Sequence, residues 1–448
     1  YRSDRLWFPR LFEDPDFLRE YIDRWFELRR GPLDVTNMRR LVNAQAAEIT
    51  FGLATAQGIS VSDWTAELNA MIAYLSRRVA WLDNQFFRPP TFSHPGGVVS
   101  AQFTLTITNT TGRAGTIYFT LDGSDPIDGN AVVYTGPIAF NASASIKSRI
   151  GASNGEWSAL NEASYVTGTP AGPGDLVISE IMYHPVGDRG AEFLELLNIN
   201  PSESLDLSLV RFAAGVEFTF PVGTTLAPGE RILVVRDSAS FQAVHGSGHS
   251  VAGEFEQSSA LDNSGDRIVL NDAGGTNILN FSYRDDPPWP DSADGDGDSL
   301  VLLDPFSNPD HDDPDNWRSS TTSDGNPGLD DGVVFAGEPG LDRDGDRLPA
   351  LLEHALGTTD LAPDLLSSVL TMHFDPDDHG EIRITRSLAA QNVALTLEWS
   401  DGLQGWQPVP EPSTLDAHLP GGRARFRTLL PAPQPARRYF RLRAELTE

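Results

Sequence analysis

The apolar residues of this 448-residue chain change their spacing near residue 90. Before that point they recur with a helical period over residues 15–30, 35–54 and 62–86. The stretch FRPPTFSHPGG then breaks the pattern with Pro and Gly. Beyond it, short runs alternate apolar and polar residues and are separated by Gly, Asp, Asn and Pro. The chain is therefore predicted to be multidomain and mainly β, with an N-terminal α-helical segment followed by tandem antiparallel β-sandwiches.

The first predicted helix has recognisable ends. Asp14 is placed to cap its amino terminus, and Pro15 suits the first helical position. Arg29 and Arg30 suit the negative end of the helix dipole, and Gly31-Pro32 end the helix. The three helices carry many large aromatic residues, so we expect an apolar neighbour to cover them.

Changes in pattern and composition divide the chain into five predicted segments. Their boundaries follow the linkers FRPPTFSHPGG and TGTPAGPGD and an Asp-rich stretch near residue 340. The segments are a helical region at 1–88, a β-sandwich at 89–168, a second β-sandwich with an acidic tail at 169–332, an Asp-rich linker with a short helix at 333–366, and a C-terminal β-sandwich at 367–448.

The composition excludes several classes of protein. The formal net charge of −30, from 63 acidic and 33 basic residues, repels nucleic acid and anionic membranes and attracts cations. The absence of Cys excludes disulfides, thiol catalysis and Cys-based metal sites. No run of about 18 uninterrupted apolar residues occurs, so the sequence is predicted not to span a membrane.

The stretches LWFPRLFEDPDFLREYIDRWFELRRGPL and WTAELNAMIAYLSRRVAWLDNQF, within residues 1–87, resemble the C-terminal helical part of a CotH-type kinase domain. The resemblance implies a nucleotide-binding lysine and metal-binding aspartates upstream of these helices, and none has a counterpart here. The only lysine, Lys147, lies in a predicted sandwich strand, and no G-x-x-x-x-G-K-[ST] motif occurs. We therefore expect the chain as given not to be an enzyme. It is either a fragment of such a kinase or a chain that lacks the catalytic half.

Two further stretches resemble known sandwich families. IYFTLDGSDP and SIKSRIGASNGEWS, in the segment 89–168, resemble the chitobiase/hexosaminidase C-terminal sandwich. LVISEIMYHPVGDRGAEFLELLN and TTLAPGERILVVRD, in the segment 169–332, resemble the lamin-tail domain, which implies an immunoglobulin-like fold. The three resemblances in this order are similar to secreted surface proteins of environmental bacteria. They imply an extracellular or cell-surface location.

The stretch DRDGDRLPALLE has the spacing of a calcium-binding loop. Asp342, Asp344 and Asp346 fall at positions 1, 3 and 5, the backbone carbonyl of Leu348 at position 7, and Glu353 at position 12. Hard oxygen ligands at this spacing can wrap one Ca²⁺, and the stretch resembles the loops of thrombospondin type III repeats and dockerins. The expected role of the ion is a structural clip between domains.

Two departures leave a second interpretation of this loop open. Arg347 stands where such loops usually have Gly, and Ala350 offers no side-chain ligand at position 9. The alternative is an Asp-rich turn that caps the helix PALLEHALG. A possible second metal site has alternating acids at Asp294, Asp296 and Asp298, but no carboxylate closes it, and Asp-Gly turns are the alternative.

Other residues that could carry chemistry have structural interpretations. His245 and His249 lie beside Gly246 and Gly248, which predicts a solvated loop instead of a zinc site. Glu192 and Glu195, three apart in a predicted strand, would point to opposite faces and could not act as a catalytic pair. Three tryptophans could stack on sugars or lie in a core: Trp157, Trp289 and Trp406.

The C-terminal segment carries a set of arginines on an acidic chain. They could dock onto the Asp-rich segment or onto a neighbouring copy, or they could face solvent. They are Arg423, Arg425, Arg427, Arg437, Arg438, Arg441 and Arg443.

The sequence favours a non-catalytic extracellular or cell-surface protein that is structural or binding, stabilised by calcium and able to self-assemble. Its expected partners are other copies of itself, a surface protein or a polysaccharide. The alternative is the C-terminal fragment of a CotH-like kinase whose catalytic residues lie upstream of Tyr1. Binding of carbohydrate through the sandwiches rests on analogy of fold alone.

Overall fold

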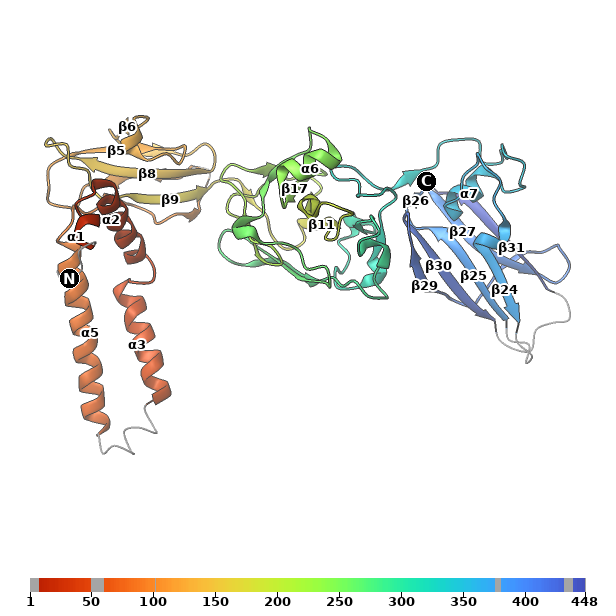
Figure 1. Ribbon diagram of the computed structural model, residues 1–448, viewed down its shortest axis with the longest axis horizontal. Coiled ribbons are helices and arrows are strands. Elements are labelled where there is room, and N and C mark those ends of the chain that lie inside the picture. Colours follow the sequence, from red (N-terminus) through yellow and green to blue (C-terminus); the bar gives the residue numbers. More distant parts are fainter. Residues whose placement is uncertain (1–7, 50–59, 101, 375–379, 431–437, 448) are drawn as a thin grey trace. The chain divides into compact units, whose positions relative to one another are not determined.

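The computed structural model describes residues 8–49, 60–100, 102–374, 380–430 and 438–447. The chain forms two compact units, Tyr1–Gly168 and Thr169–Glu448 (Figure 1). Most elements are β-strands, and the longer helices lie at the N-terminus, so the prediction of a mainly β chain with an N-terminal helical segment is confirmed. No helix among the described residues is long and apolar enough to cross a membrane.

The described part of the first unit begins with helices. As predicted, Asp14 caps the second of them: its side chain accepts hydrogen bonds from the backbone N–H groups of Asp16 and Phe17, and Pro15 opens the helix. The predicted helix at 35–54 is described as far as Ile49, and its remaining residues lie outside the described ranges. The helices are α1 (Phe8–Leu11), α2 (Pro15–Arg29), α3 (Val35–Ile49) and α5 (Val61–Asp83).

A five-stranded sheet forms the main layer of the sandwich that follows, which we call the first sandwich. Its strand order is β2-β9-β8-β5-β6, and the pairs β1-β4 and β3-β7 cover its apolar face. Leu105, Ile107, Phe140, Ile146 and Tyr165 are buried between these layers. The strands are β1 (Thr91–Phe92), β2 (Gly97–Val98), β3 (Thr104–Leu105), β4 (Ile107–Thr108), β5 (Thr116–Thr120), β6 (Val132–Val133), β7 (Ile138–Ala139), β8 (Ala144–Gly151) and β9 (Asn161–Val166).

One buried arginine fixes α2 on the first sandwich. Arg149 of β8 is 1% exposed and binds the carboxylates of Asp23 on α2 and Asp125 of the first sandwich, with N–O distances from 2.5 to 2.9 Å. Asp23 also accepts a hydrogen bond from the backbone N–H of Leu160. A buried cation shared by two carboxylates costs several kcal/mol to break, so the helix and the sandwich act as one body.

The second unit begins with what we call the second sandwich, residues 169–319. A six-stranded sheet, β18-β17-β12-β11-β21-β22, packs on a four-stranded sheet, β15-β14-β19-β20, over a large apolar core. The strands are β10 (Thr169–Pro170), β11 (Leu176–Met182), β12 (Phe193–Asn198), β13 (Leu205–Asp206), β14 (Arg211–Ala214), β15 (Phe218–Thr219), β16 (Thr225–Leu226), β17 (Arg231–Val235), β18 (Val251–Glu254), β19 (Arg267–Asn271), β20 (Asn277–Ser282), β21 (Leu300–Leu302) and β22 (Trp317–Ser319).

The two central strands of the six-stranded sheet are covered on both faces. Every residue of β11 and β12 is buried. One face packs in the main core, and the helix α6 (Ser238–His245) covers the other, with Phe241 against Met182 and Phe193. This double cover explains why both strands have nearly continuous apolar runs without alternation.

The chain then crosses an acidic segment, residues 342–364, to reach a third sandwich. This segment contains α7 (Ala350–Leu356) and leads into α8 (Leu366–Val369). The sheets β24-β25-β30-β29 and β28-β27-β31 face each other. Their strands and the short pair β23-β26 are β23 (Val333–Val334), β24 (Leu370–Phe374), β25 (Gly380–Ser387), β26 (Ala390–Gln391), β27 (Val393–Ser400), β28 (Gln407–Pro408), β29 (Ser413–Leu419), β30 (Arg423–Leu430) and β31 (Tyr439–Leu446).

Candidate metal centre

The acidic segment begins with a loop that wraps around its own aspartates. Asp342 accepts hydrogen bonds from the backbone N–H groups of Gly345 and Arg347, at 2.7 and 3.1 Å. Asp346 in turn accepts one from the N–H of Leu348, at 2.7 Å. Short acidic side chains that bind the backbone two to five residues ahead favour a tight turn over a helix.

This wrapping brings together the acids that the sequence pattern singled out. One carboxylate oxygen of each of Asp342, Asp344 and Asp346 lies within 4.8 Å of the others. Arg347 has a φ of 82°, the left-handed conformation for which such loops usually have Gly. The Arg at this position therefore does not prevent the turn. Leu348 follows with a buried side chain.

Glu353, the predicted closing ligand, lies on α7 and is 1% exposed. Neither of its carboxylate oxygens has a hydrogen-bond partner in the part of the chain that the structure describes. Burial first, and then the nearby charges of Asp344 and Asp346, together raise the pKa of Glu353 to about 7. A buried carboxyl group without a donor is costly, so this side chain needs a positive partner that none of the described residues supplies.

Two acids that the sequence analysis missed come from the return segment after α7. The backbone N–H of Asp364 donates to Asp346 at 2.8 Å, and its own Oδ2 is buried without a partner within the described ranges. Asp360 instead accepts the N–H of Arg343 at 2.9 Å, and its other oxygen lies 3.4 Å from the Arg343 guanidinium. Both acids add to the negative charge around Glu353.

The oxygens that lack partners fit a hard cation. They are Oδ2 of Asp344, both oxygens of Glu353 and Oδ2 of Asp364. Calcium takes six to eight oxygen ligands, mainly from carboxylates and carbonyls, and tolerates irregular geometry. The donor set therefore suits Ca²⁺ better than Zn²⁺, which prefers nitrogen and sulfur.

The centre is attached directly to the third sandwich. Leu356, at the end of α7, is fully buried in the same core as Val369, Ile382, Ile384 and Leu430. Gly357 then ends the helix in a left-handed conformation with a φ of 71°. Any ion held by Glu353 would therefore act on an element that belongs to this core.

The second candidate metal site has a different arrangement. Asp294 lies 2.6 Å from Nδ1 of His184, and Asp298 is buried and accepts the N–H of Gly421 at 3.2 Å. Asp296 is exposed. Within the described ranges, these three side chains are not among the acidic groups whose oxygens converge. Asp294 and Asp298 instead make contacts within the protein.

The prediction that His245 and His249 lie together in a loop is wrong for His245. His245 is the last residue of α6, not part of a loop, because Gly246 ends the helix one residue later. Its ring packs on Phe241, with centroids 4.6 Å apart, and burial lowers its pKa. His249 binds the backbone carbonyl of His245 through Nε2 at 3.0 Å.

The tryptophans and arginines also have partners within the protein. Trp289 is 5% exposed in the core of the second sandwich, and Trp406 lies under the Arg441 guanidinium at 4.4 Å. Trp157 packs edge-on against Tyr118. Arg441 also binds Glu398 at 2.6 Å. The other described arginines of the predicted patch lie on β30, on β31 or just before β31, and Arg437 falls outside the described residues.

Glu192 and Glu195 bind different arginines. Glu192 pairs with Arg236, and Glu195 lies 3.0 Å from Nε of Arg231. The cross-strand partner of Glu195 is Glu180 on β11, which the sequence analysis did not single out. Burial, and then the charge of Glu195, raise the pKa of Glu180 to about 8.

Protein donors hold this buried Glu pair. Oε1 of Glu180 accepts hydrogen bonds from Ser299 at 2.5 Å and from the N–H of Asn326 at 2.9 Å. Glu195 accepts the hydroxyl of Ser179 at 2.7 Å and the N–H of Gly328. The pair therefore binds the segment after β22 to the second sandwich.

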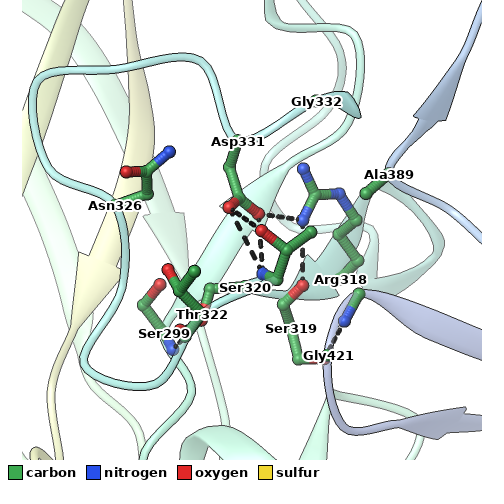
Figure 2. A network of polar contacts seen from close by, with 12 residues as sticks. Ser299, Arg318, Ser319, Ser320, Thr322, Asn326, Asp331, Gly332, Ala389 and Gly421 are labelled. Atoms are coloured by element: carbon green, nitrogen blue, oxygen red, sulfur yellow. Dashed lines mark hydrogen bonds and ion pairs between the residues drawn. The ribbon is translucent and has the colours of Figure 1, made fainter. Parts of the chain in front are cut away.

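The same segment carries a second buried ion pair at the boundary with the third sandwich. Figure 2 shows Asp331 facing the guanidinium of Arg318, which it binds. Asp331 also accepts the N–H of Thr321 at 2.9 Å. Ser319, beside Arg318, donates its hydroxyl to the carbonyl of Leu419 at 2.9 Å. A cavity of about 280 Å³ at this boundary is lined by Glu180, Glu195, Arg231, Arg318 and Asp331, among others.

Comparisons with known proteins identify two modules. Residues 169–285 match the model of the Lamin Tail Domain family, and residues 104–165 match the model of the family described as Fn3 associated. Among solved structures, the chain is 13% identical to fibronectin(III)-like modules of CbhA from Clostridium thermocellum, with a TM-score of 0.13. That match covers 43% of this chain and 90% of the other. No curated protein matches the chain.

The two family matches confirm the lamin-tail resemblance and, with the sheets described above, the tandem immunoglobulin-like β-sandwich architecture. Both matched families are non-catalytic modules, which agrees with the prediction that the chain as given is not an enzyme. Modules of this kind indicate a structural or binding protein. The resemblances to a CotH-type kinase and to the chitobiase C-terminal sandwich stay predictions.

Proposed function

We propose that the chain is a non-catalytic structural or binding protein of the bacterial cell surface or extracellular space, and that one Ca²⁺ bound in the acidic segment stabilises its third sandwich. The single observation that supports the calcium site best is Glu353. Its carboxylate is 1% exposed, and neither oxygen has a partner among the described residues. A divalent cation would neutralise this group together with the aspartates around it.

The predicted loop residues would contribute to calcium binding in different ways. Asp344 and Glu353 offer oxygens that no described group contacts by a hydrogen bond, so they would be the main ligands. Asp342 and Asp346 accept backbone N–H groups and keep lone pairs for the ion, and Leu348 would offer its carbonyl. Calcium in such a site acts as part of the fold, because the ion binds the native state and not the unfolded chain.

The sandwiches would act as spacers and as binding modules. Their partners would be other copies of the chain, a surface protein or a polysaccharide. Light scattering at high protein concentration tests self-assembly: a mass above that of one chain in Ca²⁺ would support it, and a monomer would exclude it.

Isothermal titration of the full chain with CaCl₂ tests the calcium site. We expect about one ion per chain for the wild type and no binding for Glu353→Gln, which removes the charge and keeps the shape. Asp296→Asn, at the exposed residue of the other Asp-rich stretch, is the matched control and should bind as the wild type does. An absence of calcium binding by the wild type would exclude the site.

A further inference from the structure

We infer that the return segment after α7 supplies Asp364 as a further calcium ligand, so that the ion ties this segment to the loop. The inference rests on the calcium-binding role proposed above and extends it to a residue outside the twelve-residue loop pattern. Asp364 lies eleven positions beyond Glu353 in the chain, a distance that no loop motif specifies.

Asp364 is held at the centre by its own backbone. Its N–H donates to Oδ2 of Asp346 at 2.8 Å, which fixes the residue beside a loop ligand. Its side-chain Oδ2 is buried and has no hydrogen-bond partner among the described residues, as is true of Oδ2 of Asp344 and of both oxygens of Glu353. Oδ2 of Asp364 is therefore one of four buried carboxylate oxygens of this segment that have no donor among the described residues. Buried acceptors without donors favour a cation, since water would otherwise have to satisfy them all.

Asp360, the other acid of the return segment, has a different role. One of its oxygens accepts the N–H of Arg343, and the other lies 3.4 Å from the Arg343 guanidinium. Its carboxylate is thus already matched with a cation of the chain. We assign it as a positioning residue that holds the loop against the return segment.

The return segment connects the centre to the third sandwich a second time. Beyond Asp364 the chain enters α8, whose last residue, Val369, is 3% exposed in the same core as Leu356. The ion would therefore hold both ends of the stretch from α7 to α8. Calcium binding would therefore be coupled to the folding of the segment from α7 to α8 onto the third sandwich.

Calcium titration and thermal unfolding of the full chain test this inference with three variants. We expect Asp364→Asn to weaken calcium binding at least about 10-fold, and Asp360→Asn to weaken it less. Asp401→Asn makes the same charge change at an exposed turn of the third sandwich and should bind as the wild type does. In EGTA, Asp364→Asn should unfold at the wild-type temperature or above it, because the substitution relieves repulsion among the carboxylates.

The outcomes separate the inference from the function it rests on. Wild-type protein that binds no calcium would overturn both. Wild-type binding with an equal affinity for Asp364→Asn would overturn the inference and leave the loop site intact. A lower unfolding temperature of Asp364→Asn in EGTA would also overturn it, because the residue would then have a structural role without the ion.

Discussion

Two clusters of buried acids lie in the second unit, and they neutralise their charges in different ways. In the second sandwich, Glu180 and Glu195 are 2% and 1% exposed, and protein groups donate hydrogen bonds to both. In the acidic segment, Glu353 is equally buried, yet no described group donates to either oxygen. Burial alone therefore does not identify a metal site. The two clusters differ in whether protein groups donate hydrogen bonds to the buried acid.

The two clusters also differ in the groups that can balance the charge of their buried acids. At the boundary of the second and third sandwiches, Glu195 pairs with Arg231 and Asp331 with Arg318. Among the described residues, the donors to Glu180 are the neutral groups of Ser299 and Asn326, and burial beside Glu195 raises its pKa, which favours the protonated form. One proton would not suffice in the acidic segment. The charges of Asp344, Asp346, Asp360 and Asp364 all act on Glu353, so a divalent cation is the better match.

The largest effect is expected where the protein itself supplies the counter-charge. Arg318→Leu should lower the free energy of unfolding by about 3–5 kcal/mol, because Asp331 would remain buried without its cation. Urea unfolding measures the loss, which should be the same in Ca²⁺ and in EGTA. The double variant Arg318→Leu/Asp331→Asn is the control and should recover most of the stability. A loss that calcium could repair would mean that the two clusters are not independent.

A smaller effect is expected from the proton on Glu180. Its folded pKa, about 8, lies above the ordinary value of 4.5, so the folded state binds the proton more tightly than the unfolded state does. The free energy of unfolding should therefore fall by a few kcal/mol as pH rises from about 4.5 to 8.

Glu180→Gln should remove this loss, since the amide keeps an acceptor for Ser299 and Asn326 and carries no charge. Urea unfolding at pH 5 and at pH 9 measures the difference. The variant should match the wild type at the lower pH and exceed it at the higher one. An equal pH dependence in both proteins would contradict a neutral Glu180.

The smallest effect concerns the backbone of the proposed calcium-binding loop. Arg347 holds a φ of 82°, which costs a non-glycine residue about 1 kcal/mol. Arg347→Gly should therefore tighten calcium binding several-fold in a titration, because it removes strain from the bound turn. Arg343→Gly would not serve as a control for this variant, because it would also remove the contact between Arg343 and Asp360. Weaker binding by Arg347→Gly would show that the Arg side chain itself supports the loop.

The sequence predicted the elements and contacts that are local in the chain. The cap at Asp14 and the convergence of Asp342, Asp344 and Asp346 both follow from spacings of a few residues, and the structure has both. Asp364 was missed because it reaches the centre through a turn after α7 that has no periodic pattern. The pairing of Glu180 with Glu195 depends on strand register, which a single sequence does not specify.

Gly325 illustrates a residue whose role only the structure explains. It lies in the stretch SDGNPG with a φ of 82°, and a Cβ there would lie 2.3 Å from Oε1 of Glu180. The sequence indicates a turn at this Gly but not the buried acid against it. The helix end at His245 was wrongly predicted as loop for a related reason, since Gly246 ends a helix as readily as it opens a loop.

Hydrogen–deuterium exchange of the intact chain, in Ca²⁺ and in EGTA, tests the central claim most directly. Calcium at about 1,000 times its Kd would add about 4 kcal/mol to the element that binds it. We predict slower exchange in α7 and the strands of the third sandwich, and no change in β11 and β12 of the second sandwich. Equal exchange of α7 in the two conditions would contradict the claim that Glu353 and its neighbours hold an ion.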